Sequence, residues 1–433
     1  MKKLSLAITF ALFSSCIYAQ NGINSPYSRY GFGIQSERAM GFNKGMGGVA
    51  QGFRNGQQIN IANPASYSEV DSLTALFDIG ISLQNGNYKM DNLQQNIRNT
   101  SFDYFAFQFR AKKNVGLTVG LLPITNIKYS FASSSENLEG TENVTSSYTF
   151  SGEGGLREVH ELDWGNKTNG RQMKIAFSES SAYSIQRTYS ANISTYNVQA
   201  GLQYIQPINK TDKVVIGATY TLGHNVNNDA YRSTQTNNSS ETQTIDTIRN
   251  AFQLPHTIAA GVTYYHSNRL RIGADFELQK WSDCKFPSQQ TSITNSTATD
   301  KYVSTTGQLN DRTKISAGLD WTPNPIGRGL KRWTYKAGGY YSQSYAKADI
   351  TNTITDKPYE FGVSAGISMP IYNGTTRRWN SNPRINVSAQ WIHTNIPYLN
   401  ATTLRQSALT ENYLKLCVGI TFSEWWFYKW KVK

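Results

Sequence analysis

One spacing recurs along the second half of this 433-residue chain: a glycine, two further residues, then an aromatic residue. The pairs are Gly201 with Tyr204, Gly217 with Tyr220, Gly261 with Tyr264, Gly273 with Phe276, Gly318 with Trp321, Gly338 with Tyr341, and Gly419 with Phe422. Because side chains alternate between the two faces of a β-strand, this spacing places the glycine and the aromatic residue on opposite faces. In most copies the aromatic side is apolar and the glycine side is polar. The repeat therefore predicts strands with lipid on one face and a wet lumen on the other.

Alternation of apolar and polar residues extends well beyond this repeat. From about residue 72 onward the chain divides into segments of roughly ten residues in which apolar and polar positions alternate. In residues 270–279, for example, Arg271, Asp275 and Glu277 share one face while the other face is apolar. A soluble β-sandwich gives the same alternation with its apolar face as core. Nearly all of these segments alternate, and this favours an all-β, transmembrane, antiparallel β-barrel.

The connections between these segments fall into two length classes. Six shorter connections lie near residues 111–114, 165–170, 207–212, 267–268, 322–331 and 372–383, and mostly longer Asn/Ser/Thr-rich segments lie between them. Short turns on one side and long loops on the other are typical of outer-membrane barrels. Six short turns predict about 14 strands, and 12 or 16 stay possible. The pair of strands over residues 171–205 is the least clear, because its outer loop is hard to place.

Composition excludes several classes of function. A mean hydropathy of −0.48 resembles that of a soluble protein, but a barrel has the same average because only alternate strand residues meet lipid. The formal charge of +13 is dispersed, with no basic helix or stripe, so we expect no nucleic-acid partner and favour an anionic membrane surface or anionic solutes. Three cysteines and five scattered histidines indicate no disulfide scaffold, no metal site and no cofactor.

The two ends of the chain carry separate signals. Residues 1–19 read as a signal peptide, with Lys2 and Lys3 before an apolar stretch and Ala19 at the cleavage point. Lipidation at Cys16 is the rival interpretation. Residues 20–71 are rich in Gly, Asn and Gln without alternation and are too few for a large domain, so they either trail in the periplasm or plug the lumen. Residues 72–433 form the predicted barrel, which ends in aromatic and lysine residues typical of an interfacial girdle.

Several short motifs occur together in a recognisable order. They are Asn63-Pro64-Ala65 after a glycine-rich run, Leu254-Pro255 before Gly261, Asp275-Phe276 before Trp281-Ser282, and Gly318 to Trp321 before Gly338. In this order the chain resembles the FadL family of outer-membrane long-chain fatty-acid and hydrophobic-compound transporters, in a Bacteroidetes-type branch. The resemblance implies a 14-stranded barrel with an N-terminal hatch, in the outer membrane of a Gram-negative bacterium.

The third predicted strand departs from the pattern of the family. Many relatives carry Pro-Phe-Gly where this chain has Leu122-Pro123-Ile124-Thr125. In the family a kink in this strand makes a lateral opening through which apolar substrate leaves into the membrane. A proline removes a ladder donor and bends a strand, so Pro123 is expected to keep that kink. Alternatively, Pro123 only eases an irregular strand end.

These features lead to one main hypothesis about function: passage of hydrophobic or amphipathic, fatty-acid-like small molecules across the outer membrane. The resemblance assigns the path to the hatch around Asn63, Pro64 and Ala65 and to the bend at Pro123. Lumen cations could receive an anionic head group, or they pair with lumen carboxylates and hold the plug. The cations concerned are Arg110, Arg271, Lys314 and Lys336.

A second hypothesis is a non-transporting scaffold or shuttle barrel of an outer-membrane protein secretion or assembly machine. The Asn/Ser/Thr-rich loops over residues 225–250 and 282–304 favour it, because they contain few apolar residues to bind lipid. The expected partners are outer-membrane lipids, a hydrophobic ligand and outer-membrane protein machinery. No nucleophile motif is present, so the chain is not expected to be an enzyme.

Overall fold

The computed structural model describes residues 24–72, 74–90, 93–112, 115–137, 145–160, 167–177, 184–237, 242–294, 297–347, 357–371, 383–399 and 406–425. Most of these residues are in strands. The signal peptide, Cys16, the aromatic residues after Trp425 and parts of several connections, including those near residues 165–170 and 372–383, lie outside the described residues. Within the described part of the chain, no helix has the length and apolarity needed to cross a bilayer.

Strands that continue across a bend form one pass of the wall, and the described strands make fourteen passes. The passes are β2 (Thr74–Met90); β3 (Leu93–Lys112); β4 (Val115–Pro123) with β5 (Thr125–Asn137); β6 (Thr145–Gly154) with β7 (Arg157–His160); β8 (Lys167–Phe177); β9 (Ser184–Ile193) with β10 (Gln199–Pro207); β11 (Asp212–Thr221) with β12 (His224–Val226) and β13 (Ala230–Asn237); β14 (Thr242–Ile248) with β15 (Phe252–Leu254) and β16 (Thr257–His266); β17 (Leu270–Gln279) with β18 (Phe286–Thr294); β19 (Thr297–Thr305) with β20 (Arg312–Trp321); β21 (Thr334–Gln343); β22 (Tyr359–Pro370); β23 (Arg384–Leu399); and β24 (Gln406–Trp425).

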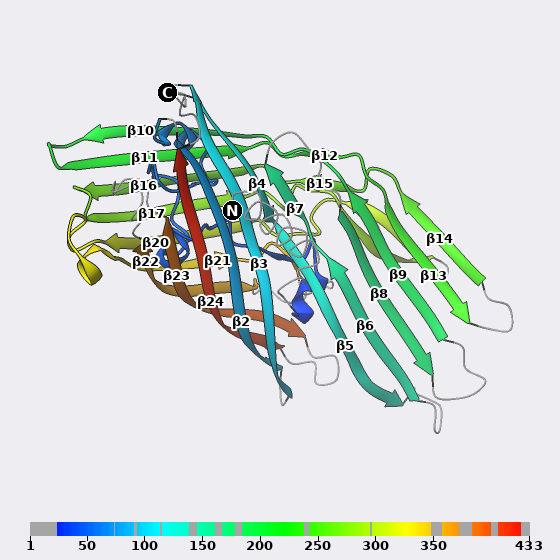
Figure 1. The fold of residues 1–433 in the computed structure, drawn as a ribbon. Helices are drawn as coiled ribbons and strands as arrows, with labels where there is room; N and C mark the ends of the chain where they lie inside the picture. Colours follow the sequence, from blue (N-terminus) through cyan, green and yellow to red (C-terminus); the bar gives the residue numbers. More distant parts are fainter. Residues whose placement is uncertain are drawn as a thin grey trace, which may run out of the picture.

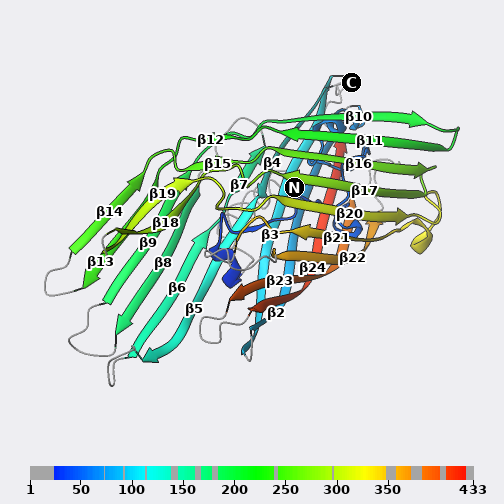
Figure 2. The ribbon, with the colours of Figure 1, turned by 180° about the vertical axis from the view of Figure 1, so that it is seen from behind.

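Each pass pairs antiparallel with the next one, and the last pass returns to the first. The closing ladder joins β2 to β24 from Thr74 opposite Trp425 to Met90 opposite Leu409. Figures 1 and 2 show the strands wrapping around the N-terminal segment. The predicted antiparallel barrel of about 14 strands is thereby confirmed.

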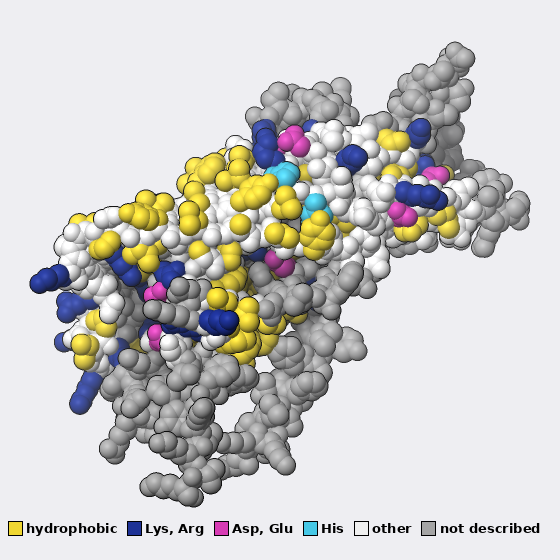
Figure 3. Space-filling model, turned by 90° about the horizontal axis from the view of Figure 1, so that it is seen from above, with side chains coloured by type: hydrophobic (Ala, Val, Ile, Leu, Met, Phe, Trp, Pro, Cys, Tyr) yellow, Lys and Arg dark blue, Asp and Glu magenta, His cyan; other side chains and the backbone are white. Residues whose placement is uncertain are grey.

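The outer surface of the wall is apolar, as a lipid-facing barrel requires. In six of the seven glycine–aromatic pairs the aromatic side chain is exposed on this surface, and Tyr264 is half-buried. Figure 3 shows hydrophobic side chains gathered over the described wall. The predicted direction of the aromatic residues is therefore the one observed.

Residues 24–71, called the plug from here on, lie inside the barrel (Figure 1). They contain only short elements: η1 (Pro26–Arg29), β1 (Ile34–Gln35), η2 (Lys44–Met46) and η3 (Pro64–Glu69); η4 (Gly329–Arg332) belongs to a wall connection. Apolar plug side chains such as Met46, Val49 and Phe53 are fully buried, and Phe53 stacks on Phe42 at 4.2 Å. The plug is thus a packed filling for a lumen that the wall side chains alone would leave open.

Several glycines of the repeat face the plug. Gly273, Gly318 and Gly338 lie side by side in the register of β17, β20 and β21. A methyl group added to Gly318 would lie 2.2 Å from the carbonyl oxygen of Met46, and one on Gly338 would lie 2.2 Å from the carbonyl carbon of the same residue. The glycine side was expected to meet a wet lumen, whereas at these positions it receives the plug.

The third pass bends at the position that the sequence indicated. β4 ends at Pro123, and the backbone N–H groups of Ile124 and Thr125 both donate to the carbonyl oxygen of Leu156, at 2.8 and 3.1 Å. β4 stays paired with β3 and β7, whereas β5 leaves β3 and pairs with β6 and with β1 of the plug. At Pro123 the wall therefore passes from the 13-stranded sheet to a second sheet, in which β1 of the plug joins β5, β6, β8, β9, β13 and β14 of the wall.

We predict that Gly318→Val unseats the plug. The new side chain would overlap the Met46 carbonyl, and overpacking of this kind costs about 1–3 kcal/mol. Trypsin cleavage after Lys44 or Arg54, measured on the purified protein, is expected to be about tenfold faster than in the parent. Ala317→Val is the matched control, because Ala317 is the exposed neighbour on the same strand. Equal cleavage rates in the two variants would contradict the packing argument.

Candidate functional site

The wall has a seam, defined here as the interval between β7 and β10. The 13-stranded sheet ends at β10 on one side and at β7 on the other. β8 belongs to the other sheet, where it pairs with β6 and β9, so among the described residues no strand lies between β7 and β10. Asn197, just before β10, donates to Glu158 Oε1 on β7 at 2.9 Å, which brings the two edges together at one point.

Helix η3 of the plug lies behind the seam and contacts β4 and β10. A methyl group on Gly116 of β4 would lie 2.0 Å from the carbonyl oxygen of Tyr67, and one on Gly201 of β10 would lie 2.3 Å from Asn63 Oδ1. Glycine is therefore needed on both strands for η3 to approach them. Burial raises the pKa of Tyr67 above its usual range, which keeps this phenol neutral.

The motif Asn63-Pro64-Ala65 begins η3. Asn63 is the N-cap residue: its Oδ1 accepts from the backbone N–H of Ala65 at 3.0 Å, and Pro64 occupies the first helical position. The Asn63 amide also donates to the carbonyl oxygen of Gln51 at 2.9 Å. On β10, Gln199 donates to the carbonyl oxygen of Ala62 at 3.1 Å. The motif thus both starts the helix and holds it against the edge strand.

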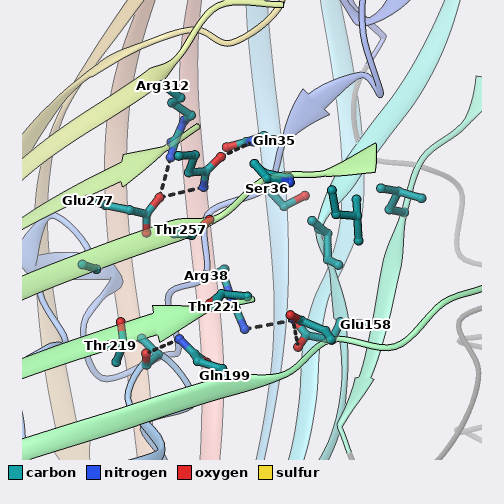
Figure 4. Close-up of a pocket in the computed structure, with 18 of the residues that line it drawn as sticks. Gln35, Ser36, Arg38, Glu158, Gln199, Thr219, Thr221, Thr257, Glu277 and Arg312 are labelled. Atoms are coloured by element: carbon teal, nitrogen blue, oxygen red, sulfur yellow. Dashed lines mark hydrogen bonds and ion pairs between the residues drawn. The ribbon is translucent and has the colours of Figure 1, made fainter. Parts of the chain in front are cut away.

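Arg38 of the plug reaches the seam from inside. Its Nη2 lies 3.0 Å from Glu158 Oε2. The Glu158 carboxylate raises the pKa of the Arg38 guanidinium above its usual range. Figure 4 shows Arg38 pointing toward Glu158. Arg38, Glu158 and Asn197, called the seam cluster, therefore connect the plug, β7 and the segment before β10.

A cavity of about 900 Å³ lies between the plug and the wall beside the seam cluster. Its lining includes apolar side chains such as Ile124, Leu156 and Ile193. It also includes charged groups, among them an ion pair of 2.8 Å between Arg312 and Glu277 that Figure 4 shows. An apolar lining with a few fixed polar groups is typical of a small-molecule site, and this mixture suits an amphipathic molecule.

Two buried polar contacts fix the plug to the wall, and the second of them lies in the lining of the cavity. The Lys44 ammonium on η2 pairs with the Asp103 carboxylate on β3, and both are nearly inaccessible to solvent. On β17, Asp275 Oδ2 accepts from the backbone N–H groups of Ala50 and Gln51 at 2.6 and 2.9 Å. Removing one partner of such a buried pair is expected to be strongly destabilising.

The structure does not bring the four predicted lumen cations into one site. Arg271 pairs with Asp320, with Nε to Oδ1 at 2.7 Å, and Lys336 donates to Asn386 at 3.1 Å. The Arg110 guanidinium lies 3.4 Å from the carbonyl oxygen of Val70 in the plug. Lys314 is the one of the four that lines the cavity, and its ammonium lies 4.6 Å from the centre of the Tyr340 ring.

The seam cluster escaped the sequence analysis. Arg38 and Glu158 are 120 residues apart, and neither lies in a motif or an alternating pattern that would single it out. The sequence contains one indirect signal of the seam: the strands over residues 171–205 are the hardest to place. In the described part of the chain, no group of three or more His, Cys, Asp or Glu side chains could hold a metal ion.

Comparison with known proteins identifies relatives of the whole chain. A family model described as BamG matches residues 1–433. No curated protein matches the sequence. A solved FadL homologue of Pseudomonas aeruginosa is 12% identical with a TM-score of 0.55 over 90% of this chain and 99% of its own.

Two further solved structures are described as monoaromatic hydrocarbon channels. A deletion mutant of TodX is 14% identical with a TM-score of 0.53, and CymD is 13% identical with a TM-score of 0.51. Each alignment covers 90% of this chain and 99% of the solved one. At such low identity the likeness shows a shared fold, and that fold is the one implied by the FadL resemblance.

We predict that Arg38→Ala loosens the seam. Losing one ion pair of this partly buried kind, worth about 1–3 kcal/mol, is expected to speed maleimide labelling of a Thr221→Cys reporter in the cavity about tenfold. Cys284 and Cys417 are buried and give a low background. Glu158→Gln should act alike, and the double variant no more than either alone. Additive effects would show that Arg38 and Glu158 act separately.

Proposed function

The chain belongs to the BamG family and shares its fold with a solved FadL homologue and with solved monoaromatic hydrocarbon channels, and on this premise we propose that it passes hydrophobic or amphipathic, fatty-acid-like small molecules across the outer membrane. In this proposal residues 1–19 direct export, residues 20–71 are the hatch, and residues 72–433 are the barrel of a Gram-negative outer membrane. We assign no reaction to the chain, in keeping with neighbours described as channels.

The observation that carries the proposal is the cavity of about 900 Å³ beside the seam. A molecule in the cavity would be enclosed by the plug, by strands on both sides of the seam and by the seam cluster. Passage from the cavity to the membrane would then involve the opening of the Arg38–Glu158 and Asn197–Glu158 contacts and a shift of η3. An apolar molecule gains from such a lateral exit, because it avoids an aqueous route.

Individual residues take roles in this path. We propose that Asn63, Pro64 and Ala65 position η3 as the movable part of the hatch, and that Pro123 keeps the wall divided beside the cavity. Lys314 is the proposed contact for an anionic head group, because it lines the cavity. Arg110 contacts the carbonyl oxygen of Val70 in the plug, and Arg271, which pairs with Asp320 of the wall, lies 4.8 Å from the ring centre of Phe53 in the plug. These contacts support the alternative role of holding the plug for Arg110 and Arg271. Lys336 donates to Asn386, which is itself a wall residue.

We predict that locking the seam stops passage. In proteoliposomes, the cysteines of a Glu158→Cys/Asn197→Cys variant would be joined across the seam by a short bis-maleimide that contains a reducible disulfide, because the native side chains bridge the seam with a 2.9 Å hydrogen bond. Uptake of a dansyl-labelled fatty acid should fall at least tenfold on cross-linking and return on reduction. Each single cysteine variant is the control. Equal uptake by the double variant before and after cross-linking would refute a lateral exit at the seam.

A second candidate function is a non-transporting scaffold barrel of an outer-membrane protein machine. The fit of the plug favours it: Met46 lies against two glycines and Lys44 is buried with Asp103, so displacing η2 would be costly. Native mass spectrometry of the barrel purified in detergent separates the candidates. A co-purifying apolar ligand that is lost on Pro123→Ala supports passage, whereas a stoichiometric protein partner without any ligand supports the scaffold.

A further inference from the structure

The edge strand β10 presents unpaired backbone groups to the seam. Leu222 donates its N–H to the carbonyl oxygen of Val198 at 2.9 Å, so these two residues form a hydrogen-bonded pair that continues the β10–β11 ladder. Because such pairs alternate along an antiparallel ladder, Ala200, Leu202 and Tyr204 direct their backbone groups to β11. Gly201, Gln203 and Ile205 therefore direct theirs to the seam, where the described residues provide no ladder partner.

The outer face of β10 is also unusually open. Leu202 is 69% exposed, whereas Leu414 on β24, a strand that is paired on both sides, is 58% exposed. Tyr204 is 60% exposed. The excess at Leu202 follows from the missing neighbour, whose side chains would flank Leu202 and Tyr204. These side chains face the same surface as the lipid-facing aromatics of the wall. Hydrocarbon cannot hydrogen-bond the exposed N–H and C=O groups beside them, so an unpaired edge here is costly.

The plug covers β10 from the lumen only. It reaches this strand through side-chain contacts, such as Asn63 against Gly201 and the Gln203 amide on the carbonyl oxygen of Gln51 at 2.9 Å. No plug residue among those described forms a ladder with β10. At Pro123, where β5 leaves β3, the edge of β5 does have a ladder partner. There β1 of the plug pairs with β5, with Ile34 opposite Asn126.

We propose that β10 docks an extended segment of a second protein, which adds to the wall as an antiparallel strand beside Gln199–Pro207. An extended polypeptide is the partner that supplies N–H and C=O groups at the spacing of Gly201, Gln203 and Ile205. Every second side chain of that segment would be apolar, next to Leu202 and Tyr204. Pro207 has no N–H, so pairing ends there. This inference does not require that a small molecule passes through the barrel.

The test uses the full chain in lipid nanodiscs with Tyr204→Cys and a peptide probe. The peptide matches the nine-residue length of β10, alternates valine and threonine, and carries one cysteine that is moved along it position by position. Tyr204 would be a non-hydrogen-bonded position toward the new strand, where side chains approach most closely. We expect disulfide yields that alternate strongly with period two along the peptide.

Matched variants identify the backbone contribution. Ile205→Pro removes an N–H directed to the seam and should lower the disulfide yield at least fivefold, whereas Ile205→Ala keeps that N–H and should leave the yield unchanged. Ile216→Cys on β11 is exposed on the same surface but lies on a strand that is paired on both sides, so it should give no disulfide. This last comparison does not depend on the folding of the proline variant.

Four outcomes would overturn the proposal. Equal yields at every peptide position would show apolar adsorption without a ladder. Equal yields for Tyr204→Cys and Ile216→Cys, or no disulfide at Tyr204→Cys, would show that β10 has no docking role. Preferential cross-linking of two Tyr204→Cys chains to each other would mean that a second copy of the barrel occupies this edge.

Discussion

The close approach of the plug backbone to the glycines of the wall is the contact on which the rest of the structure depends. Residues 41–52 cross the strands of the wall one after another: Gly41 lies against Gly419, Met46 against Gly318 and Gly338, Val49 against Gly273, and Gln51 against Gly217. Because a Cβ at Gly217, Gly318 or Gly338 would overlap the plug backbone, the contact sets the height of the plug in the barrel. At that height Lys44 meets Asp103, and Asp275 meets two N–H groups of the plug.

The wall was predictable from the sequence because its signal is local. A period of two in apolar residues, together with the glycine–aromatic spacing, predicts strands, and the alternation of short and long connections predicts their number. The plug was not predictable in this way. Residues 20–71 have no period, and their conformation follows from the shape of the wall around them rather than from neighbours in sequence. For the same reason the sequence did not show that glycines of the repeat also contact the plug.

At the candidate site the same distinction holds residue by residue. Asn63 and Pro64 could be found because their motif resembles that of the FadL family, and the structure gives the two residues a local role as N-cap and first-turn proline. Pro123 could be found because proline breaks a ladder wherever it stands. Arg38, Glu158 and Asn197 meet only through the fold. The region that resisted placement, residues 171–205, contains the bend from β9 to β10 that leaves an edge of the wall unpaired.

The ladder between β2 and β24 has a consequence for the order of assembly. It joins Thr74 to Trp425, so the ring cannot close before the whole chain has been made and exported. The plug precedes every wall strand in the sequence, yet its contacts reach as far along the chain as Gly419. Contacts between such distant residues form slowly. The plug is therefore made before every wall strand and is among the last parts to acquire its contacts.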